Sequence, residues 1–140
     1  MAQAVGRKTK ESLFTGAFSS FSIDDVAEAK EVYGTTLGLE VDETEEGLQL
    51  NIDDADPIFL YPKEDHEPAT FTVLNFTVAS IDEVVEQLKS RGVEFESYDG
   101  EMKTDDNDIF RGGESGDGPN IAWFKDPAGN FLSVIETDQT

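Results

Sequence analysis

Apolar and polar residues alternate along several short segments, which predicts strands that are buried on one face. In the stretch 13–23, Phe21 and Ile23 fall on one side of the chain, and Phe18 and Ser20 fall on the other. Successive side chains of a strand point to opposite faces, so we expect a strand here. Apolar runs between turn residues predict further strands over 39–43, 48–52, 58–62, 70–79, 93–98, 121–125 and 131–135, with a short one near 109–110.

Two segments have the spacing of amphipathic helices. Asp24 or Asp25 offers an N-cap for the first helix, and Ser80 or Asp82 offers one for the second. Behind these caps, apolar residues recur every three or four positions, as a helix with one buried face requires. They are Val26, Ala29, Val32 and Tyr33 in the first helix, and Ile81, Val84, Val85 and Leu88 in the second.

The order of predicted elements repeats in the two halves of the chain. Each half is predicted to run strand, helix, strand, strand, strand, with modules over about 13–66 and 67–140. We therefore expect an α+β domain of two βαβββ modules, curled into an incomplete mixed β-barrel with the helices outside. Residues 1–12 are polar and lack periodicity, which predicts a flexible tail. The polar, glycine-rich tract 99–120 is expected to be a long loop that can cover a site.

Composition narrows the range of functions. The 140 residues carry 31 acidic against 10 basic side chains, a net charge of −21, and no cysteine. A phosphate backbone requires clustered cations, so nucleic acid is not an expected partner, and anionic membranes are disfavoured too. Without a signal-like or membrane-length apolar run, we expect a cytoplasmic protein. The acidity favours either a surface adapted to high salt or a groove for a cationic ligand.

A hairpin is predicted near the end of the chain. Two apolar runs flank Asp126-Pro127-Ala128-Gly129-Asn130, where Pro127 presets the first turn corner and Gly129 accepts positive φ. The sequence Trp-Phe-x-Asp-Pro-x-Gly-Asn resembles the end of the vicinal oxygen chelate proteins, the glyoxalase/bleomycin-resistance/dioxygenase superfamily. The stretch from Phe21 to Leu39, with its Asp-x-x-x-Ala-x-x-x-Tyr spacing and Leu-Gly-Leu end, is similar to the opening module of that family.

The resemblance also implies where a metal would bind. Metal enzymes of the family take ligands from inner strand positions, one of them seven residues before each helix cap and one after the final turn. In this sequence these positions are Phe18, Val73 and Ser133. Phe and Val offer no lone pair, and a neutral hydroxyl is a poor ligand for divalent ions that prefer imidazole or carboxylate. We therefore expect no metal and no other cofactor; a fourth position, in the third or fourth strand, is not assigned.

The only histidine and the acidic runs are weaker candidates. His66 lies among carboxylates, where a raised pKa or an adventitious metal contact is conceivable, but an exposed loop histidine before a proline is the simpler interpretation. The segment around it resembles one in a bacterial branch of the family, which makes His66 a candidate for lining the mouth of the pocket and for catalysis. The acidic run 53–56 lacks the glycine and distal glutamate of a calcium-binding EF-hand loop, so an acidic turn is expected.

Alternation also predicts which side chains face the inner side of the sheets. They combine aromatic rings with a few amide and hydroxyl groups, as small-molecule pockets do, although the same set could fill a core or a dimer interface. Asn75 is expected to be a buried amide that needs hydrogen-bond partners. The predicted ligand-binding residues are Phe18, Ser20, Phe71, Val73, Asn75, Trp123, Phe131 and Ser133.

The sequence is compatible with three functions. The first is a metal-independent binding protein, similar to the bleomycin-resistance branch, that holds an aromatic, neutral or cationic ligand as a homodimer. The second is a lyase or isomerase with a relocated site that uses His66. The third is a structural or interaction role with a filled cavity.

Overall fold

The structure, a computed structural model, describes residues 13–53, 55–116 and 118–137, so the tail predicted over 1–12 lies outside the described part. The first module contains strand β2 (Ser19–Ile23), helix α1 (Val26–Lys30), π-helix η1 (Glu31–Thr36) and strands β3 (Glu40–Thr44), β4 (Gly47–Asn51) and β5 (Ile58–Pro62). The second module contains β6 (Thr72–Val78), α2 (Ile81–Ser90), 3₁₀-helix η2 (Gly100–Met102), β7 (Phe110–Arg111), α3 (Gly112–Ser115), β8 (Asn120–Lys125) and β9 (Phe131–Glu136).

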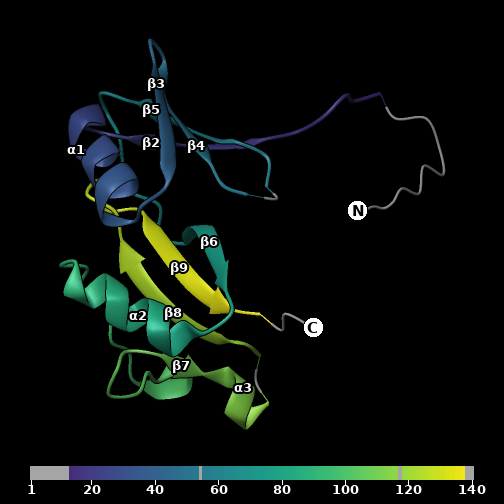
Figure 1. The fold of residues 1–140 in the computed structure, drawn as a ribbon, viewed down its shortest axis with the longest axis vertical. Helices are drawn as coiled ribbons and strands as arrows, with labels where there is room; N and C mark the ends of the chain where they lie inside the picture. The colour runs from purple at the N-terminus through teal and green to yellow at the C-terminus, as the bar shows by residue number, and fades with distance from the viewer. Residues whose placement is uncertain (1–12, 54, 117, 138–140) are drawn as a thin grey trace.

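The strands form two mixed sheets, one in each module. Their orders are β2-β5-β4-β3 and β6-β9-β8-β7, so each module places its last strand beside its first. The first and last strands pair in parallel, and the other pairs are antiparallel. The sheets lie one above the other in Figure 1, with α1 and α2 on the same side and no closed barrel. The predicted α+β fold with two βαβββ-like modules is confirmed.

The helices cover the sheet faces that the alternation predicts. In the second module, α2 buries Ile81, Val85 and Leu88. The strand face toward this helix carries the fully buried Leu132 and Val134. Ser80 is the N-cap of α2 and Asp25 that of α1, where the Asp25 carboxylate accepts a hydrogen bond from the Glu28 amide at 3.0 Å. No helix among the residues that the structure describes is long and apolar enough to cross a membrane.

Two predicted strands differ in extent. The first strand begins at Ser19 and not at Leu13. In the parallel register, the residue before Ser19 lies opposite Pro57, which has no amide hydrogen to donate to the neighbouring strand. The strand predicted over 93–98 is reduced to one bridge, between Phe95 and Phe124. After this bridge, the Tyr98 amide donates a hydrogen bond to the Thr104 hydroxyl, and the chain turns away from the sheet. The short strand β7 then pairs with β8.

The terminal hairpin turn joins the two modules through buried polar groups. Gly129 has φ +87° and donates its amide to the Asp126 carbonyl at 2.9 Å, as the predicted turn requires. The Asp126 carboxylate accepts hydrogen bonds from the Tyr33 hydroxyl at 2.7 Å and from the Asn130 amide at 2.8 Å. The Asn130 side chain also donates to the Ser22 carbonyl at 2.9 Å. The residues that carry the family resemblance therefore hold the modules together.

Candidate ligand-binding site

The inner face of the second sheet carries the aromatic side chains that alternation placed there. Trp123 and Asn75 both pair with Ser133 across the sheet, so the three side chains share the face opposite α2. Phe131 lies two residues before Ser133 and belongs to the same face. Alternation predicted this face for Asn75, Trp123, Phe131 and Ser133, but it did not predict the shift in the β6–β9 register between Thr72 and Leu74.

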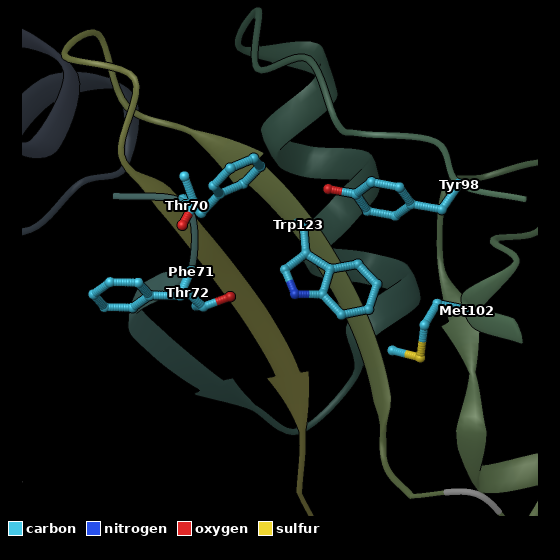
Figure 2. Close-up of a pocket in the computed structure, with 7 residues that line it drawn as sticks. Thr70, Phe71, Thr72, Tyr98, Met102 and Trp123 are labelled. Atoms are coloured by element: carbon cyan, nitrogen blue, oxygen red, sulfur yellow. The ribbon is translucent and has the colours of Figure 1, made fainter. Parts of the chain in front are cut away.

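A cavity of about 240 Å³ opens on this face (Figure 2). Trp123 projects from β8 into its centre, with Tyr98 and Met102 on one side and the segment 70–72 on the other. The lining is aromatic and apolar, with hydroxyl groups but no charged side chain. It consists of Thr70, Phe71, Thr72, Tyr98, Met102, Trp123 and Phe131.

Ring contacts fix the orientation of Trp123. Its ring meets the Tyr98 ring edge to face, with the ring centroids 5.5 Å apart. The centroid of the Phe110 ring, on the neighbouring strand β7, lies 6.3 Å from that of Trp123. Burial, together with the negative charge of Glu96, raises the pKa of Tyr98. The phenol therefore stays neutral at physiological pH and remains a hydrogen-bond donor. A half-buried, pre-oriented indole beside neutral donors is suited to stack on a planar ligand.

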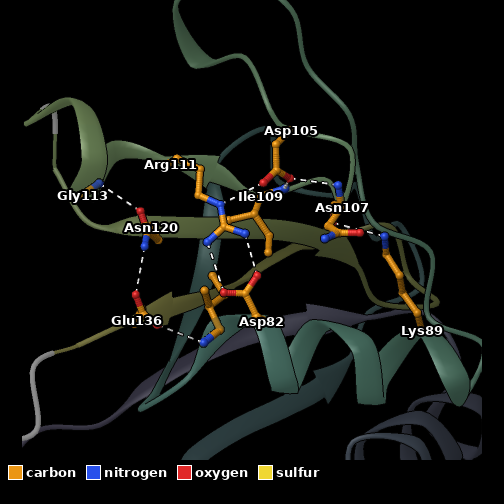
Figure 3. A network of polar contacts seen from close by, with 10 residues as sticks. Asp82, Lys89, Asp105, Asn107, Ile109, Arg111, Gly113, Asn120 and Glu136 are labelled. Atoms are coloured by element: carbon orange, nitrogen blue, oxygen red, sulfur yellow. Dashed lines mark hydrogen bonds and ion pairs between the residues drawn. The ribbon is translucent and has the colours of Figure 1, made fainter.

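Ion pairs fasten the segment that supplies Met102 (Figure 3). Arg111 donates two hydrogen bonds to Asp82 of α2, at 2.6 and 3.2 Å, and one to Asp105 at 2.8 Å. Lys89 of α2 donates to the Asn107 carbonyl at 3.1 Å. The segment from Gly100 to Ile109 is therefore tied to the outer helix while η2, within it, forms one wall of the cavity.

The carboxylates of this network are favoured in their charged form. The Arg111 hydrogen bonds hold the pKa of Asp82 below its usual value. At Asp105, burial acts in the opposite direction, but the bonds from Arg111 and from the Ile109 and Asn107 amides keep the pKa low. The ion pairs of Arg111 with Asp82 and Asp105 therefore persist at neutral pH and weaken as these carboxylates become protonated.

The structure brings together only part of the predicted ligand-binding set. Phe71, Trp123 and Phe131 line the cavity, whereas Val73 lies at the register shift between Thr72 and Leu74 and packs against the hydrophobic core. The expectation of a buried Asn75 is wrong, because this residue is exposed and accepts a hydrogen bond from the Ser133 hydroxyl. Ser133 is fully buried. Since Asn75 already has a protein partner, its amide does not require a ligand.

Phe18 and Ser20 belong to the first module and do not reach this cavity. Phe18 lines a separate one. Conversely, the sequence interpretation missed Tyr98, Met102, Thr70 and Thr72. The only signal for Met102 was the expectation that the polar tract 99–120 covers a site, since a loop residue has no periodicity that reveals its direction.

The repeat identifies the fourth of the positions that ligate metal in the family. Phe18 and Val73 occupy equivalent places, two residues before Ser20 and Asn75. Ser20 pairs with Phe59, and Asn75 pairs with Ser133, so Phe59 is the counterpart of Ser133. Two phenylalanines, a valine and a serine already bonded to Asn75 do not fit a divalent cation. No group of three or more His, Asp or Glu side chains suited to a metal occurs in the described ranges.

His66 bridges the two modules. Its Nε2 lies 3.0 Å from the Ala128 carbonyl oxygen, and its Nδ1 lies 2.6 Å from the Ser22 hydroxyl. A carbonyl only accepts, so Nε2 donates to Ala128, and Nδ1 shares a hydrogen bond with the Ser22 hydroxyl. Both ring nitrogens thus have structural partners, the residue is half-buried, and it does not line the aromatic cavity.

Comparisons with known proteins agree with this geometry. The model of the Glyoxalase/Bleomycin resistance protein/Dioxygenase superfamily matches residues 19–134. No curated protein matches the sequence. Among solved structures, TnmS3, an antibiotic binding protein from Streptomyces sp. CB03234, is 22% identical, with 91% of this chain and 100% of that chain covered and a TM-score of 0.61.

Two further solved structures are similar in fold. Lactoylglutathione lyase from Agrobacterium tumefaciens is 18% identical, with 85% of this chain and 90% of that chain covered and a TM-score of 0.59. The fosfomycin resistance protein FosX from Listeria monocytogenes is 13% identical, with 91% and 97% covered and a TM-score of 0.64. Identities this low support a shared fold and do not assign an activity.

Proposed function

Since the chain belongs to the Glyoxalase/Bleomycin resistance protein/Dioxygenase superfamily, we propose that it is a metal-independent small-molecule binding protein. Its ligand is an aromatic molecule, neutral or cationic, held in the cavity around Trp123. The observation that carries this proposal is the uncharged aromatic lining of that cavity. A planar ligand gains stacking and apolar burial there, and the Tyr98 and threonine hydroxyls offer hydrogen bonds.

Charge supports the choice of ligand class. No charged residue lines the cavity, although the Lys125 ammonium lies 5.1 Å from the centre of the Phe131 ring, and the net charge of −21 would repel a carboxylate ligand at long range. A neutral or cationic molecule avoids the long-range repulsion, and a cation can also interact with the faces of the aromatic rings. The antibiotic-binding description of TnmS3 shows that a binding role has precedent on this fold.

The experiment uses Trp123 as a reporter, because it is the only tryptophan in the sequence. Protein treated with chelator is screened by thermal shift against planar aromatic compounds, and hits are confirmed by titration of Trp123 fluorescence. We expect stabilising hits whose calorimetric affinity falls at least tenfold in Trp123→Ala. Phe14→Ala removes an exposed aromatic residue that does not line the cavity and is the control. Hits that bind Trp123→Ala as well as they bind the native chain would contradict the proposal.

We also infer a homodimer in solution. The large apolar side chains that stay exposed in the described part are Leu13, Phe14, Phe18, Phe71 and Met102. Phe71 and Met102 border the aromatic cavity, and Leu13 to Phe18 run outward from β2 (Figure 1). A second copy would cover this apolar surface. Sedimentation velocity at 0.2 M and 1 M salt tests the inference, and a monomer at both concentrations would contradict it.

A further inference from the structure

An apolar cavity of about 160 Å³ lies beneath α2, on the face of the second sheet that is opposite to Trp123. It shares no lining residue with the cavity around Trp123. The helix lies across β8 and β9 (Figure 1), and the cavity occupies part of the space between helix and sheet. The second sheet therefore has one cavity on each face.

Strand pairing explains the floor of this cavity. Phe76 of β6 lies directly opposite Val134 of β9, and Phe124 of β8 lies opposite Leu132, two residues before Val134. Because side chains alternate along a strand, the Phe76, Phe124 and Val134 side chains share the face toward α2. Val78, two residues after Phe76, lines the cavity from the same face.

The helix and the first module close the other sides. Val84 and Leu88 lie four positions apart on α2, so they are neighbours on one side of the helix. Leu37, the C-cap of η1, lines the cavity from the first module. Phe124 and Val134 are 1% exposed, whereas Val84 and Leu37 are half-buried. The floor is therefore sealed, and the cavity opens at its rim, where a small molecule enters without unfolding of α2.

The lining favours one class of occupant. It consists only of leucine, valine and phenylalanine side chains. A buried water needs about two to four hydrogen-bond partners, and hydrocarbon side chains provide none. The strands behind the lining pair with one another, so their backbone groups already have partners. Apolar cavities of about 150 Å³ stay dry and accept benzene or xenon, so this cavity has the size and the chemistry for a small hydrocarbon.

We propose that the cavity beneath α2 is a binding site for a small, uncharged apolar molecule of about the size of benzene. The guest leaves water and gains contacts with the phenylalanine rings and the aliphatic side chains. Because Leu37 belongs to the first module, a bound guest contacts both modules and stabilises the folded chain by mass action. The site lies on the face opposite to Trp123, so it is independent of the function proposed above and of the surface that a second copy would cover.

The test follows methyl signals of the native protein by NMR during a titration with benzene. Val84, Leu88 and Val134 carry methyl groups at the cavity, and the Trp123 indole reports on the other cavity. We expect saturable shifts of these methyl signals that fit a 1:1 site. If they do not shift, or if the shifts are confined to the Trp123 indole, the proposal is overturned.

Phenol is the matched probe, because it adds one hydroxyl to the same ring. In the cavity this hydroxyl would have no hydrogen-bond partner, so the affinity read from the same methyl signals should fall at least about tenfold. Equal affinities of benzene and phenol at these signals would mean that the guest is not held in the hydrocarbon lining, which would also overturn the proposal.

A pair of variants then places the guest. Val84→Phe puts a larger side chain at the cavity, and Val26→Phe makes the same change at a half-buried valine of α1 outside it. We expect benzene to shift the Leu88 and Val134 signals with native affinity in Val26→Phe and at least about tenfold more weakly in Val84→Phe. Native affinity in Val84→Phe, or equal losses in both variants, would overturn the proposal. If Val84→Phe does not fold, the native titrations with benzene and phenol decide by themselves.

Discussion

The hydroxyl of Tyr33 donates a hydrogen bond to the carboxylate of Asp126 at 2.7 Å, across 93 residues of chain. Tyr33 lies on the π-helix of the first module, and Asp126 opens the hairpin turn of the second. Both residues are buried. Burial and the neighbouring carboxylate raise the pKa of Tyr33 far above its usual value, so the phenol remains a donor throughout the physiological range. This contact makes the two modules depend on each other for stability.

Tyr33→Phe should therefore destabilise the protein. The buried Asp126 carboxylate keeps its bonds from Asn130 but loses the phenolic donor, which typically costs about 1–3 kcal/mol in the free energy of unfolding. Urea denaturation followed by circular dichroism measures the loss. Tyr61→Phe removes a hydroxyl from a half-buried tyrosine of β5 and serves as the control. Equal stability of the two variants would show that the contact contributes nothing between the modules.

His66→Ala should affect stability and not ligand binding. The change removes hydrogen bonds to Ser22 and Ala128, and we expect a loss of about 1–2 kcal/mol. His66→Gln can still donate toward Ala128 and should recover part of it. Binding at the Trp123 cavity should stay within twofold of the native affinity. If His66→Ala is as stable as the native protein but loses turnover of some compound, the lyase or isomerase alternative is favoured instead.

Arg111→Gln should loosen the wall of the aromatic cavity without changing a lining residue. The bonds to Asp82 and Asp105 disappear, so hydrogen exchange over residues 100–109 should become faster. Because a less ordered wall must be ordered on binding, affinity for an aromatic ligand should fall about three- to tenfold. Lys103→Gln removes one positive charge from the same segment and is the control.

The ion pairs of Arg111 with Asp82 and Asp105 should weaken in acid. The pKa values of Asp82 and Asp105 are lowered in the folded state, so their stabilising effect is present above the unfolded pKa of about 4 and is lost as pH falls through the folded values. The faster exchange of residues 100–109 in Arg111→Gln should therefore be reproduced in the native protein by acid. If exchange in this segment is the same in native protein and variant at pH 7, the ion pairs do not hold it.

Salt should stabilise the protein, because 31 acidic side chains oppose only 10 basic ones. Raising the ionic strength from 0.1 to 1 M shortens the screening length from about 10 to about 3 Å. We expect the melting temperature to rise by several degrees. Glu45→Lys/Glu46→Lys adds two charges at each of two exposed positions, which takes the net charge from −21 to −17 and should reduce the response. A melting temperature that falls with salt would show that ion pairs outweigh the overall repulsion.

The sequence predicted the parts of the fold that depend on local chemistry. Pro127 and Gly129 determine the terminal turn, and the alternation around Ser133 determines which face of the sheet is covered by a helix. The partners of Tyr33 and His66 could not be predicted, because they come from the other module and follow no periodicity. Local pattern specifies the direction of a side chain but not what it meets across the fold.

The candidate site was predicted only in part for the same reason. Alternation placed Phe18 and Trp123 on inner faces, but it could not show that the two faces hold separate cavities. Tyr98 and Met102 enter the aromatic cavity because Thr104 and Arg111 shape the loop around them. Those contacts depend on the folded arrangement of α2, β7 and the loop together.

The most direct measurement is a calorimetric titration of chelator-treated protein with zinc, nickel, iron(II) and manganese ions, each alone and in 0.2 M salt. With Phe18, Phe59 and Val73 at three of the four positions, we expect only weak, unsaturable heats from the acidic surface. A 1:1 site with submicromolar affinity that disappears in Ser133→Ala would contradict metal-independent binding and restore the metal chemistry of the family.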